Sequence, residues 1–263
     1  MSWRRVRAVL LHQWYDTRRS PVRTIELAYW PVLWLVLWGF ITNYILSAGA
    51  DVPGGVRILL GGLILWELTY RASLEMSWAF MIDVWDRNIL NLHASPLTPA
   101  EHFVGSLIFS LIRASAAVAL LVVMAWLFFD YNLLDAGRVV PAAVLILLGM
   151  GFALGLAIRA IILRYGSNAE IVAWSLPFLV QPVAAVFYPI EVLPGWLQAV
   201  ANAVPASHVF EALRAFVTDG EVLAARLGAG LALDVVYFAL AATYSARVYH
   251  TVRVRGLLGR PGY

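Results

Sequence analysis

Two residue types are missing from the 263-residue sequence: it has no cysteine, and all nineteen of its basic residues are arginine. The absence of cysteine excludes disulfides, thiolate metal sites and cysteine nucleophiles. The absence of lysine excludes Schiff-base chemistry and the Gly-x-x-x-x-Gly-Lys motif with which a P-loop binds nucleotide phosphates. The chain therefore carries no P-loop nucleotide site of its own.

Charged residues are also scarce. They make up 13% of the sequence, apolar residues make up 62%, and the mean hydropathy is +0.77. A soluble domain is about half apolar and about a quarter charged. A core of this size cannot hide such an apolar surplus from water, so the composition indicates a membrane protein.

Six segments are apolar enough to cross a bilayer, which takes ~20 residues. They are Leu27–Leu46, Val56–Ile82, Phe103–Phe129, Val139–Leu163, Ile171–Tyr188 and Leu227–Val248. The apolar run Ala8–Leu11 is too short for a cleaved signal peptide, so the first span is expected to be retained. With no internal repeat, the sequence predicts one all-α, polytopic membrane domain over residues 1–263.

The arginines predict the orientation of this domain. With the N-terminus in the cytoplasm, thirteen arginines fall on the cytoplasmic side, four fall outside, and Arg71 and Arg113 lie within spans. Positive residues concentrate on the cytoplasmic side of membrane proteins. We therefore expect both termini in the cytoplasm.

Three segments outside the spans have patterns of their own. Within residues 1–24, Trp3, Val6, Leu10 and Trp14 recur at helical spacing, which favours a helix in the cytoplasmic interface over a frayed polar tail. Residues 83–102 form a cytoplasmic loop, either a short docking helix or a plain connection, after which Thr98 or Pro99 begins the next helix. Residues 189–226 hold two short apolar helices split by proline, which suggests a re-entrant hairpin on the outer face.

Motifs in two of these segments resemble a known family. Asp86-Arg87-Asn88-Ile89-Leu90 leads to Ser95-Pro96-Leu97-Thr98 in the cytoplasmic loop. In the outer region, Leu193-Pro194-Gly195 precedes Pro205, which is followed nine residues later by Arg214. With the N-terminal helix, these motifs resemble the type-2 ABC exporter permeases, a family of polysaccharide, glycolipid and drug exporters.

The resemblance implies a dimer of this chain, or a pair with a similar permease, bound to two copies of a separate P-loop ATPase in the bacterial cytoplasmic membrane. ATP and Mg²⁺ would bind to that partner, with no cofactor, metal or nucleic acid on this chain. The coupling residues would be Asp86, Arg87, Asn88, Leu90, Leu92, Ser95, Pro96 and Leu97. The outer gate or hairpin would comprise Pro194, Gly195, Trp196, Pro205, His208 and Arg214.

The second span contains charges that are costly inside a bilayer. Glu67, Arg71 and Glu75 are spaced four residues apart and share one helix face, near Tyr70 and Trp78. This face is either a polar and aromatic track for a lipid-linked, glycan or hydrophobic substrate, or an ion cluster that holds helices together. The self-pairing spacing favours the second interpretation.

Arg113 and Asp234 are single charges within the third and sixth spans. They are expected to pair with each other or with the charges of the second span. An unpaired carboxylate among Glu67, Glu75 and Asp234 would instead suit an ion-coupled secondary transporter, which is the alternative function. Because no His-x-x-x-His, nucleophile elbow or catalytic triad is present, we expect no catalysis by this chain.

Overall fold

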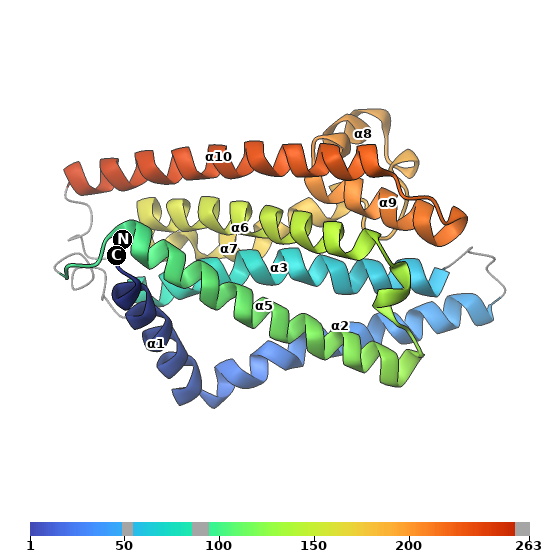
Figure 1. The fold of residues 1–263 in the computed structure, drawn as a ribbon, viewed down its shortest axis with the longest axis horizontal. Coiled ribbons are helices and arrows are strands. Elements are labelled where there is room, and N and C mark those ends of the chain that lie inside the picture. Colours follow the sequence, from blue (N-terminus) through green and yellow to red (C-terminus); the bar gives the residue numbers. More distant parts are fainter. Residues whose placement is uncertain (49–54, 86–94, 256–263) are drawn as a thin grey trace.

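The computed structural model describes residues 1–48, 55–85 and 95–255 of the protein. Within these ranges the chain is helical and has no strand (Figure 1). Its elements are α1 (Trp3–Arg19), α2 (Pro21–Ser47), α3 (Gly55–Trp85), α5 (Pro99–Phe129), η1 (Leu133–Ala136), α6 (Val139–Tyr165), η2 (Gly166–Ala169), α7 (Glu170–Val183), η3 (Ile190–Val192), α8 (Gly195–Asn202), α9 (Pro205–Asp219) and α10 (Ala224–Val254). This confirms the prediction of an all-α protein.

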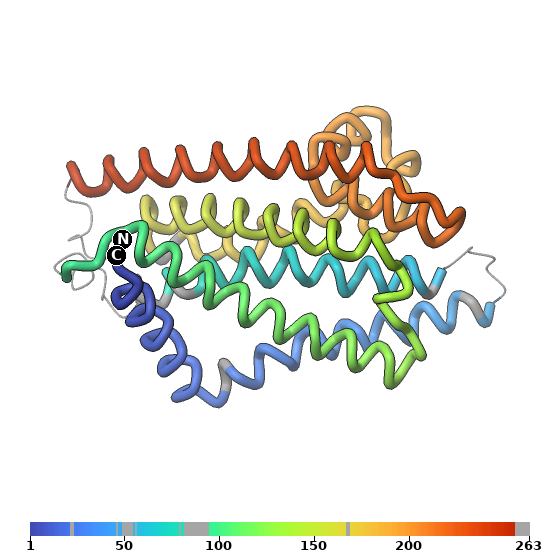
Figure 2. The backbone as a smooth tube through the Cα atoms, in the orientation of Figure 1, coloured from blue at the N-terminus to red at the C-terminus, as the bar shows by residue number. Residues whose placement is uncertain are grey.

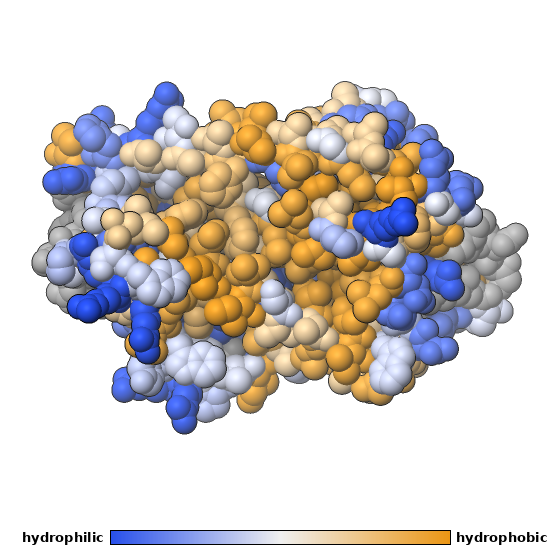
Figure 3. Space-filling model, viewed as in Figure 1, coloured by the Kyte–Doolittle hydropathy of each residue, from blue (hydrophilic) through white to orange (hydrophobic). Residues whose placement is uncertain are grey.

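The long helices run side by side in one elongated bundle, with α1 and the C-terminal end of α10 at the same end (Figure 2). Apolar side chains cover the middle of the bundle in the view of Figure 3, and polar side chains gather at both ends. An apolar band between two polar ends is the surface that a bilayer requires. The end with α1 is called here the α1 end, and the other end, with α8 and α9, the hairpin end.

Four of the helices are long and apolar enough to cross a membrane: α2, α5, α6 and α10. They correspond to the first, third, fourth and sixth predicted spans. The helix of the second predicted span, α3, is 31 residues long but carries Glu67, Arg71 and Glu75. The fifth, α7, has 14 residues.

Helix α5 begins at Pro99 with Thr98 as its cap, which confirms the predicted start of this helix. The Thr98 side chain accepts a hydrogen bond from the Glu101 backbone, and the Glu101 carboxylate accepts one from the Thr98 backbone. Pro99 occupies the first turn, where its missing N–H leaves no bond unmade. This reciprocal capping box fixes the first residue of the helix.

The central helix pair, α3 and α6, packs closely through glycine. A Cβ on Gly151 would lie 2.7 Å from the Thr69 carbonyl oxygen, and one on Gly155 would lie 2.9 Å from that of Ser73. Two glycines four residues apart let helix backbones approach in membranes. At the same seam the Thr69 hydroxyl donates to the Leu147 carbonyl over 3.0 Å.

The fifth predicted span is shorter than expected, since α7 ends at Val183 rather than at Tyr188. Pro177 and Pro182 lie inside the helix, where proline removes backbone donors. Ala185 then takes a left-handed conformation with φ of 53° and turns the chain away from the helix axis.

The hairpin end follows the predicted pattern of two short helices. In this region α8 is largely exposed, with Trp196 at 71% and Val200 at 47% exposure. In contrast, α9 is buried over most of its length and packs in the main core beside Tyr131 and Leu60. Burial raises the pKa of the Tyr131 phenol well above its usual range.

Candidate functional site

The charges of α3 form a buried chain of ion pairs, as the spacing predicted. The Arg71 Nε lies 2.7 Å from Glu67 Oε1, and its Nη1 lies 3.9 Å from Glu75 Oε1. All three side chains are buried. Arg71 therefore faces two carboxylates on its own helix. One positive charge cannot neutralise both, so a second cation near Glu75 is needed to balance the charge.

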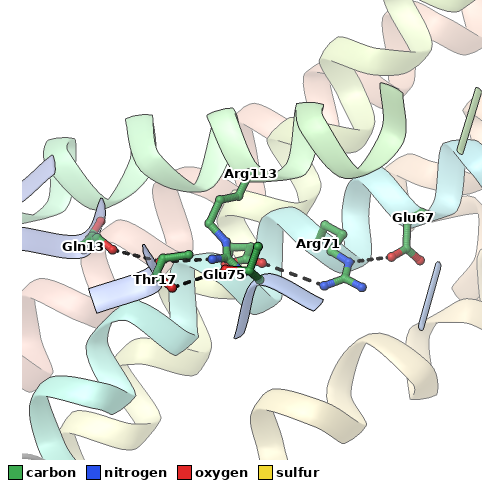
Figure 4. Close-up of polar contacts among 7 residues, drawn as sticks. Gln13, Thr17, Glu67, Arg71, Glu75 and Arg113 are labelled. Atoms are coloured by element: carbon green, nitrogen blue, oxygen red, sulfur yellow. Dashed lines mark hydrogen bonds and ion pairs between the residues drawn. The ribbon is translucent and has the colours of Figure 1, made fainter. Parts of the chain in front are cut away.

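That second cation is Arg113 of α5, whose Nε lies 2.7 Å from Glu75 Oε2 (Figure 4). Arg113 also donates to the Thr17 hydroxyl of α1 over 3.2 Å. One turn earlier on α1, Gln13 donates to Ser106 of α5 over 3.0 Å. The network of Glu67, Arg71, Glu75 and Arg113, called here the charged core, thus joins α3, α5 and α1.

The aromatic residues of the predicted track pack against α7. Tyr70 lies beside Phe178 with 5.2 Å between ring centroids, and Trp78 meets Trp174 edge to face at 5.4 Å. The structure therefore brings Glu67, Arg71 and Glu75 together with Arg113, while Tyr70 and Trp78 lie at the contact between α3 and α7.

The predicted coupling segment falls partly outside the described residues: Asp86, Arg87, Asn88, Leu90 and Leu92 belong to the undescribed range 86–94. Its last part is described. Ser95 and Pro96 are exposed and Leu97 is half-buried. The Arg5 guanidinium of α1 donates to the Pro96 carbonyl oxygen, so the N-terminal helix holds the end of this segment.

Glu101 connects α1, the end of the coupling segment and the start of α5. Its carboxylate is fully buried and accepts hydrogen bonds from the backbone N–H of Ser2 at 2.6 Å and of Thr98 at 2.9 Å. Arg5 lies 3.4 Å from the same carboxylate. One acidic side chain thereby fixes the start of two helices.

The predicted apolar face of α1 is only partly the one that packs on the protein. Val6 is buried, but Trp3 and Trp14 are 63% and 53% exposed. The packed face includes Val9, whose Cβ would lie 2.8 Å from a Cβ on Gly105 of α5. Sequence periodicity identified the helix but not this contact, because a glycine on α5 sets which side of α1 approaches.

At the hairpin end, Arg214 and Glu211 stabilise the turn before α8. Glu211 accepts from Arg214 Nη2 at 2.7 Å and from the backbone N–H of Ile190 at 3.0 Å. Pro205 occupies the first turn of α9, and Pro194 precedes the first residue of α8, Gly195. The two prolines thus begin the two short helices.

The loop between α8 and α9 is closed by two buried side chains of α9. Ser207 donates to the Ala201 carbonyl over 2.6 Å, and His208 Nε2 donates to the Asn202 carbonyl over 2.9 Å. Both bonds satisfy the C-terminal carbonyls of α8, which have no partner within that helix. His208 therefore belongs to the helix connection, and exposed Trp196 lies on the outer surface of α8.

Asp234 of α10 differs from the other buried charges. It is 5% exposed, and its two carboxyl oxygens have no hydrogen-bond partner among the described residues. Its Oδ2 lies 2.8 Å from where a Cβ on Gly149 of α6 would be. The prediction that Arg113 pairs with the charges of the second span is thus confirmed, and Asp234 does not take part in that pairing.

Several connecting residues had no sequence signal. Gln13, Thr17 and Ser106 extend the charged core, and Arg5 binds Pro96 from 91 residues away in the sequence. Such pairs depend on which helices become neighbours, which local periodicity does not determine. These residues join helices to one another.

No curated protein matches this chain. The sequence profile of the family described as ABC-2 type transporter matches residues 5–217, which is most of the chain and includes most of α1, the charged core, α8 and most of α9. The chain is therefore a multi-pass membrane protein of the permease type and belongs to the ABC-2 type transporter family.

Proposed function

We propose that the chain is the permease subunit of an ATP-driven exporter in a bacterial cytoplasmic membrane. A separate P-loop ATPase, present in two copies with its own ATP and Mg²⁺, would supply the energy. The cargo would be a lipid-linked, glycan or hydrophobic molecule that moves outward from the cytoplasm or inner leaflet. The family membership and the apolar band support this proposal.

The proposal includes six spans, with α3 and α7 crossing beside the four long apolar helices. A helix of 31 residues is ~46 Å long at 1.5 Å per residue, enough to cross ~30 Å of hydrocarbon. The pairing of its charges with Arg113 lowers their cost in lipid. An even number of spans then places both ends of the chain at the α1 end, in the cytoplasm.

One observation carries the coupling mechanism: the end of the coupling segment is attached to two helices at once. Arg5 binds the Pro96 carbonyl, and Glu101 binds the backbone of both Ser2 and Thr98. A force applied by an ATPase to the coupling segment would therefore reach α1 and α5 together. Through Arg113 and Glu75 it would reach α3 as well.

In this mechanism the charged core acts as a brace that transmits movement. Its members are buried inside one chain and pair with one another, which favours a structural role over a substrate track. The hairpin at Pro194–Arg214 would act as the outer gate, since α8 is exposed while α9 remains anchored in the core.

A second copy of the chain is proposed to cover α2. Of the four long apolar helices, α2 is the least buried: 17% of its most apolar stretch lies inside the protein. Its side chains Leu33, Leu37, Phe40 and Tyr44 are exposed and line a hollow of about 460 Å³. The natural absence of cysteine makes Leu37→Cys a clean probe, and we expect it to cross-link two copies in membranes. Leu145→Cys on α6, exposed in a different helix, is the control and should not cross-link.

The proposal is tested first by purifying the tagged chain from its native membranes in mild detergent. We expect a P-loop ATPase to co-purify in stoichiometric amount and to hydrolyse ATP. Arg87→Glu should release that ATPase without loss of folded permease. Arg138→Glu, which makes the same charge reversal at an exposed position just before the first residue of α6, should retain it.

The opposite result would favour the ion-coupled transporter. A chain that purifies without an ATPase, and whose transport in liposomes follows an ion gradient, would reject the exporter. The carboxyl of Asp234, which has no hydrogen-bond partner among the described residues, is the feature that favours this alternative. Loss of gradient-driven transport in Asp234→Asn would then identify the coupling group.

A further inference from the structure

Two large aromatic side chains of α1 lie on its surface. Trp3 and Trp14 are exposed, whereas Val6 and Val9 of the same helix are buried. The helix crosses the direction of the long helices at the α1 end of the bundle (Figure 1). A helix of this orientation lies in the plane of a membrane surface, where exposed aromatic side chains have lipid to contact.

Helix geometry gives the direction in which these tryptophans point. Successive residues of an α-helix are about 100° apart, so Trp14, nine residues after Arg5, points to the opposite side of α1. Arg5 donates to the Pro96 carbonyl oxygen just before α5, whose start lies at the α1 end of the bundle (Figure 1). The side of α1 that carries Trp14 therefore faces back toward the apolar band.

Two arginines lie on the same side of the helix as the tryptophans. Arg7 follows Trp3 by four residues, and Arg18 follows Trp14 by four, so the four side chains point within about 60° of one another. Both arginines are exposed. Together the four residues, called here the Trp–Arg strip, extend over ~22 Å of the helix.

The Trp–Arg strip carries positive charge without an acid beside it. Helix α1 contains five arginines and one acidic residue, Asp16. Asp16 comes two residues after Trp14, about 200° around the helix, and its carboxylate lies 3.4 Å from His12 Nδ1. The acid is therefore on the side of Arg5. The strip presents cations beside indole rings, a combination that suits the anionic headgroups of a leaflet.

The start of α2 indicates the depth of the strip in the membrane. Helix α2 begins at Pro21, directly after α1, and its apolar span begins at Thr24. Tyr29 and Trp30 of this span are exposed. Tyrosine and tryptophan concentrate at the interface between water and lipid. The hydrocarbon region thus begins within a few residues of the end of α1, which places α1 among the headgroups.

We propose that the Trp–Arg strip of α1 binds anionic phospholipid, with the headgroup phosphates at Arg7 and Arg18 and the indole rings of Trp3 and Trp14 at the level of the headgroups. The proposed orientation of the chain places this lipid in the cytoplasmic leaflet. The site goes beyond the export function, because it is separate from any cargo path and from the coupling segment. Lipid bound here would support the helix that holds Pro96.

Quenching by brominated lipid tests the proposal in the full-length chain. Leu11→Cys with a bimane label reports on the strip, because Leu11 is exposed and lies four residues after Arg7 and seven before Arg18. The chain has no cysteine of its own, so this label is unique. Nanodiscs contain phosphatidylglycerol and phosphatidylcholine in equal amounts, and one or the other is brominated near the headgroup end of its acyl chains. The ratio of quenching gives the ratio of the two lipids beside the label.

The two arginines set the expected ratio. Each arginine near an anionic surface contributes about fivefold, so phosphatidylglycerol should be enriched beside Leu11 roughly 25-fold at low salt. A label at Leu145→Cys, exposed on α6, reports on the surrounding lipid and should give a ratio near one. In the double variant Arg7→Gln/Arg18→Gln, the ratio beside Leu11 should fall close to that beside Leu145.

A matched pair of variants tests the direction of the strip. Arg18 and Arg19 are adjacent and exposed but point about 100° apart. Arg18→Gln should lower the enrichment about fivefold, whereas Arg19→Gln should leave it unchanged. Trp3→Ala/Trp14→Ala should lower the quenching by both lipids, because α1 would lie less deeply in the headgroup region. The thermal unfolding temperature of each variant shows that the protein is still folded.

Three results would overturn the assignment. Equal quenching by the two lipids beside Leu11 would show that the strip does not select anionic lipid. Equal loss in Arg18→Gln and Arg19→Gln would show that the total charge of α1, and not the strip, attracts the lipid. A label at Leu11 that neither lipid quenches would show that this side of α1 faces water or another protein. None of these measurements involves an ATPase, so they leave the exporter proposal to its own test.

Discussion

Removal of one cation from the charged core tests whether this network is a structural brace. Arg113→Gln keeps a polar side chain of moderate length on α5, but among the described residues it leaves the Glu75 carboxylate with Arg71 as its one cation, at 3.9 Å. Arg71 already forms an ion pair with Glu67 at 2.7 Å. In the wild type two carboxylates face two guanidinium groups, so the variant has one buried negative charge without compensation.

The distances set the expected magnitude. Two unit charges 2.7 Å apart, as in the Arg113–Glu75 pair, attract by roughly 6 kcal/mol at an effective dielectric constant of about 20. Burial of both groups costs a similar amount, so the intact pair contributes little net stability. The loss of one partner leaves the cost without the attraction and is expected to destabilise by about 3–5 kcal/mol. Glu75→Gln, which leaves Arg113 uncompensated, should have a comparable effect.

The double variant Glu75→Gln/Arg113→Gln is the informative one. It removes both charges, so it should be more stable than either single variant and close to the wild type. Thermal unfolding in detergent, followed by the fluorescence of the eleven tryptophans, measures all four proteins. At about 2–4 °C per kcal/mol for a chain of this size, each single variant should unfold roughly 6–20 °C earlier.

Additive losses would refute this reasoning. If the decrease in unfolding temperature of the double variant equals the sum of the decreases of the two single variants, Glu75 and Arg113 do not compensate each other. If all three variants unfold like the wild type, the network is not a brace. The substrate-track interpretation of Glu67, Arg71 and Glu75 would then regain support.

Three further predictions use the same unfolding assay or limited proteolysis. Gly151→Ala should destabilise by about 1–3 kcal/mol, because its Cβ would meet the α3 backbone, whereas Gly228→Ala, with no atom within 4 Å, should be neutral or stabilising. Asp234→Asn should raise the unfolding temperature by removing a buried charge without a described partner, and a decrease would reveal a partner. Glu101→Gln weakens the attraction for Arg5 and should speed tryptic cleavage after the arginines of α1; unchanged cleavage would show that α1 is held by packing alone.

The helices were predictable where local chemistry defines them. The start of α5 was predicted from Thr98 and Pro99, because the residues that begin a helix are close together in the sequence. The end of α7 was not, although Pro177 and Pro182 are visible in the sequence. Apolar composition continues to Tyr188, and hydropathy does not register the left-handed conformation at Ala185.

In the candidate site, contacts within one helix were predictable from the sequence, and contacts between helices were not. The i, i+4 spacing predicted the pairing of Arg71 with Glu67, because both residues lie on one helix. The attachment of Arg5 to Pro96 and of Arg113 to Thr17 joins helices that are distant in the sequence. Such contacts follow from tertiary packing, for example the approach of Val9 to Gly105, which no periodicity encodes.

The arrangement of the ion pairs of α3 has a consequence for how the helices can move. An apolar seam between α3, α5 and α1 could slide, since lipid solvates apolar side chains as well as protein does. A chain of ion pairs cannot slide without separating charges in a low-dielectric medium. Arg113, bound to Glu75 and to Thr17, therefore fixes the register of three helices, and Glu101 fixes two of them again near the membrane surface. In the mechanism proposed above, movement from the coupling segment would then shift these helices as one unit.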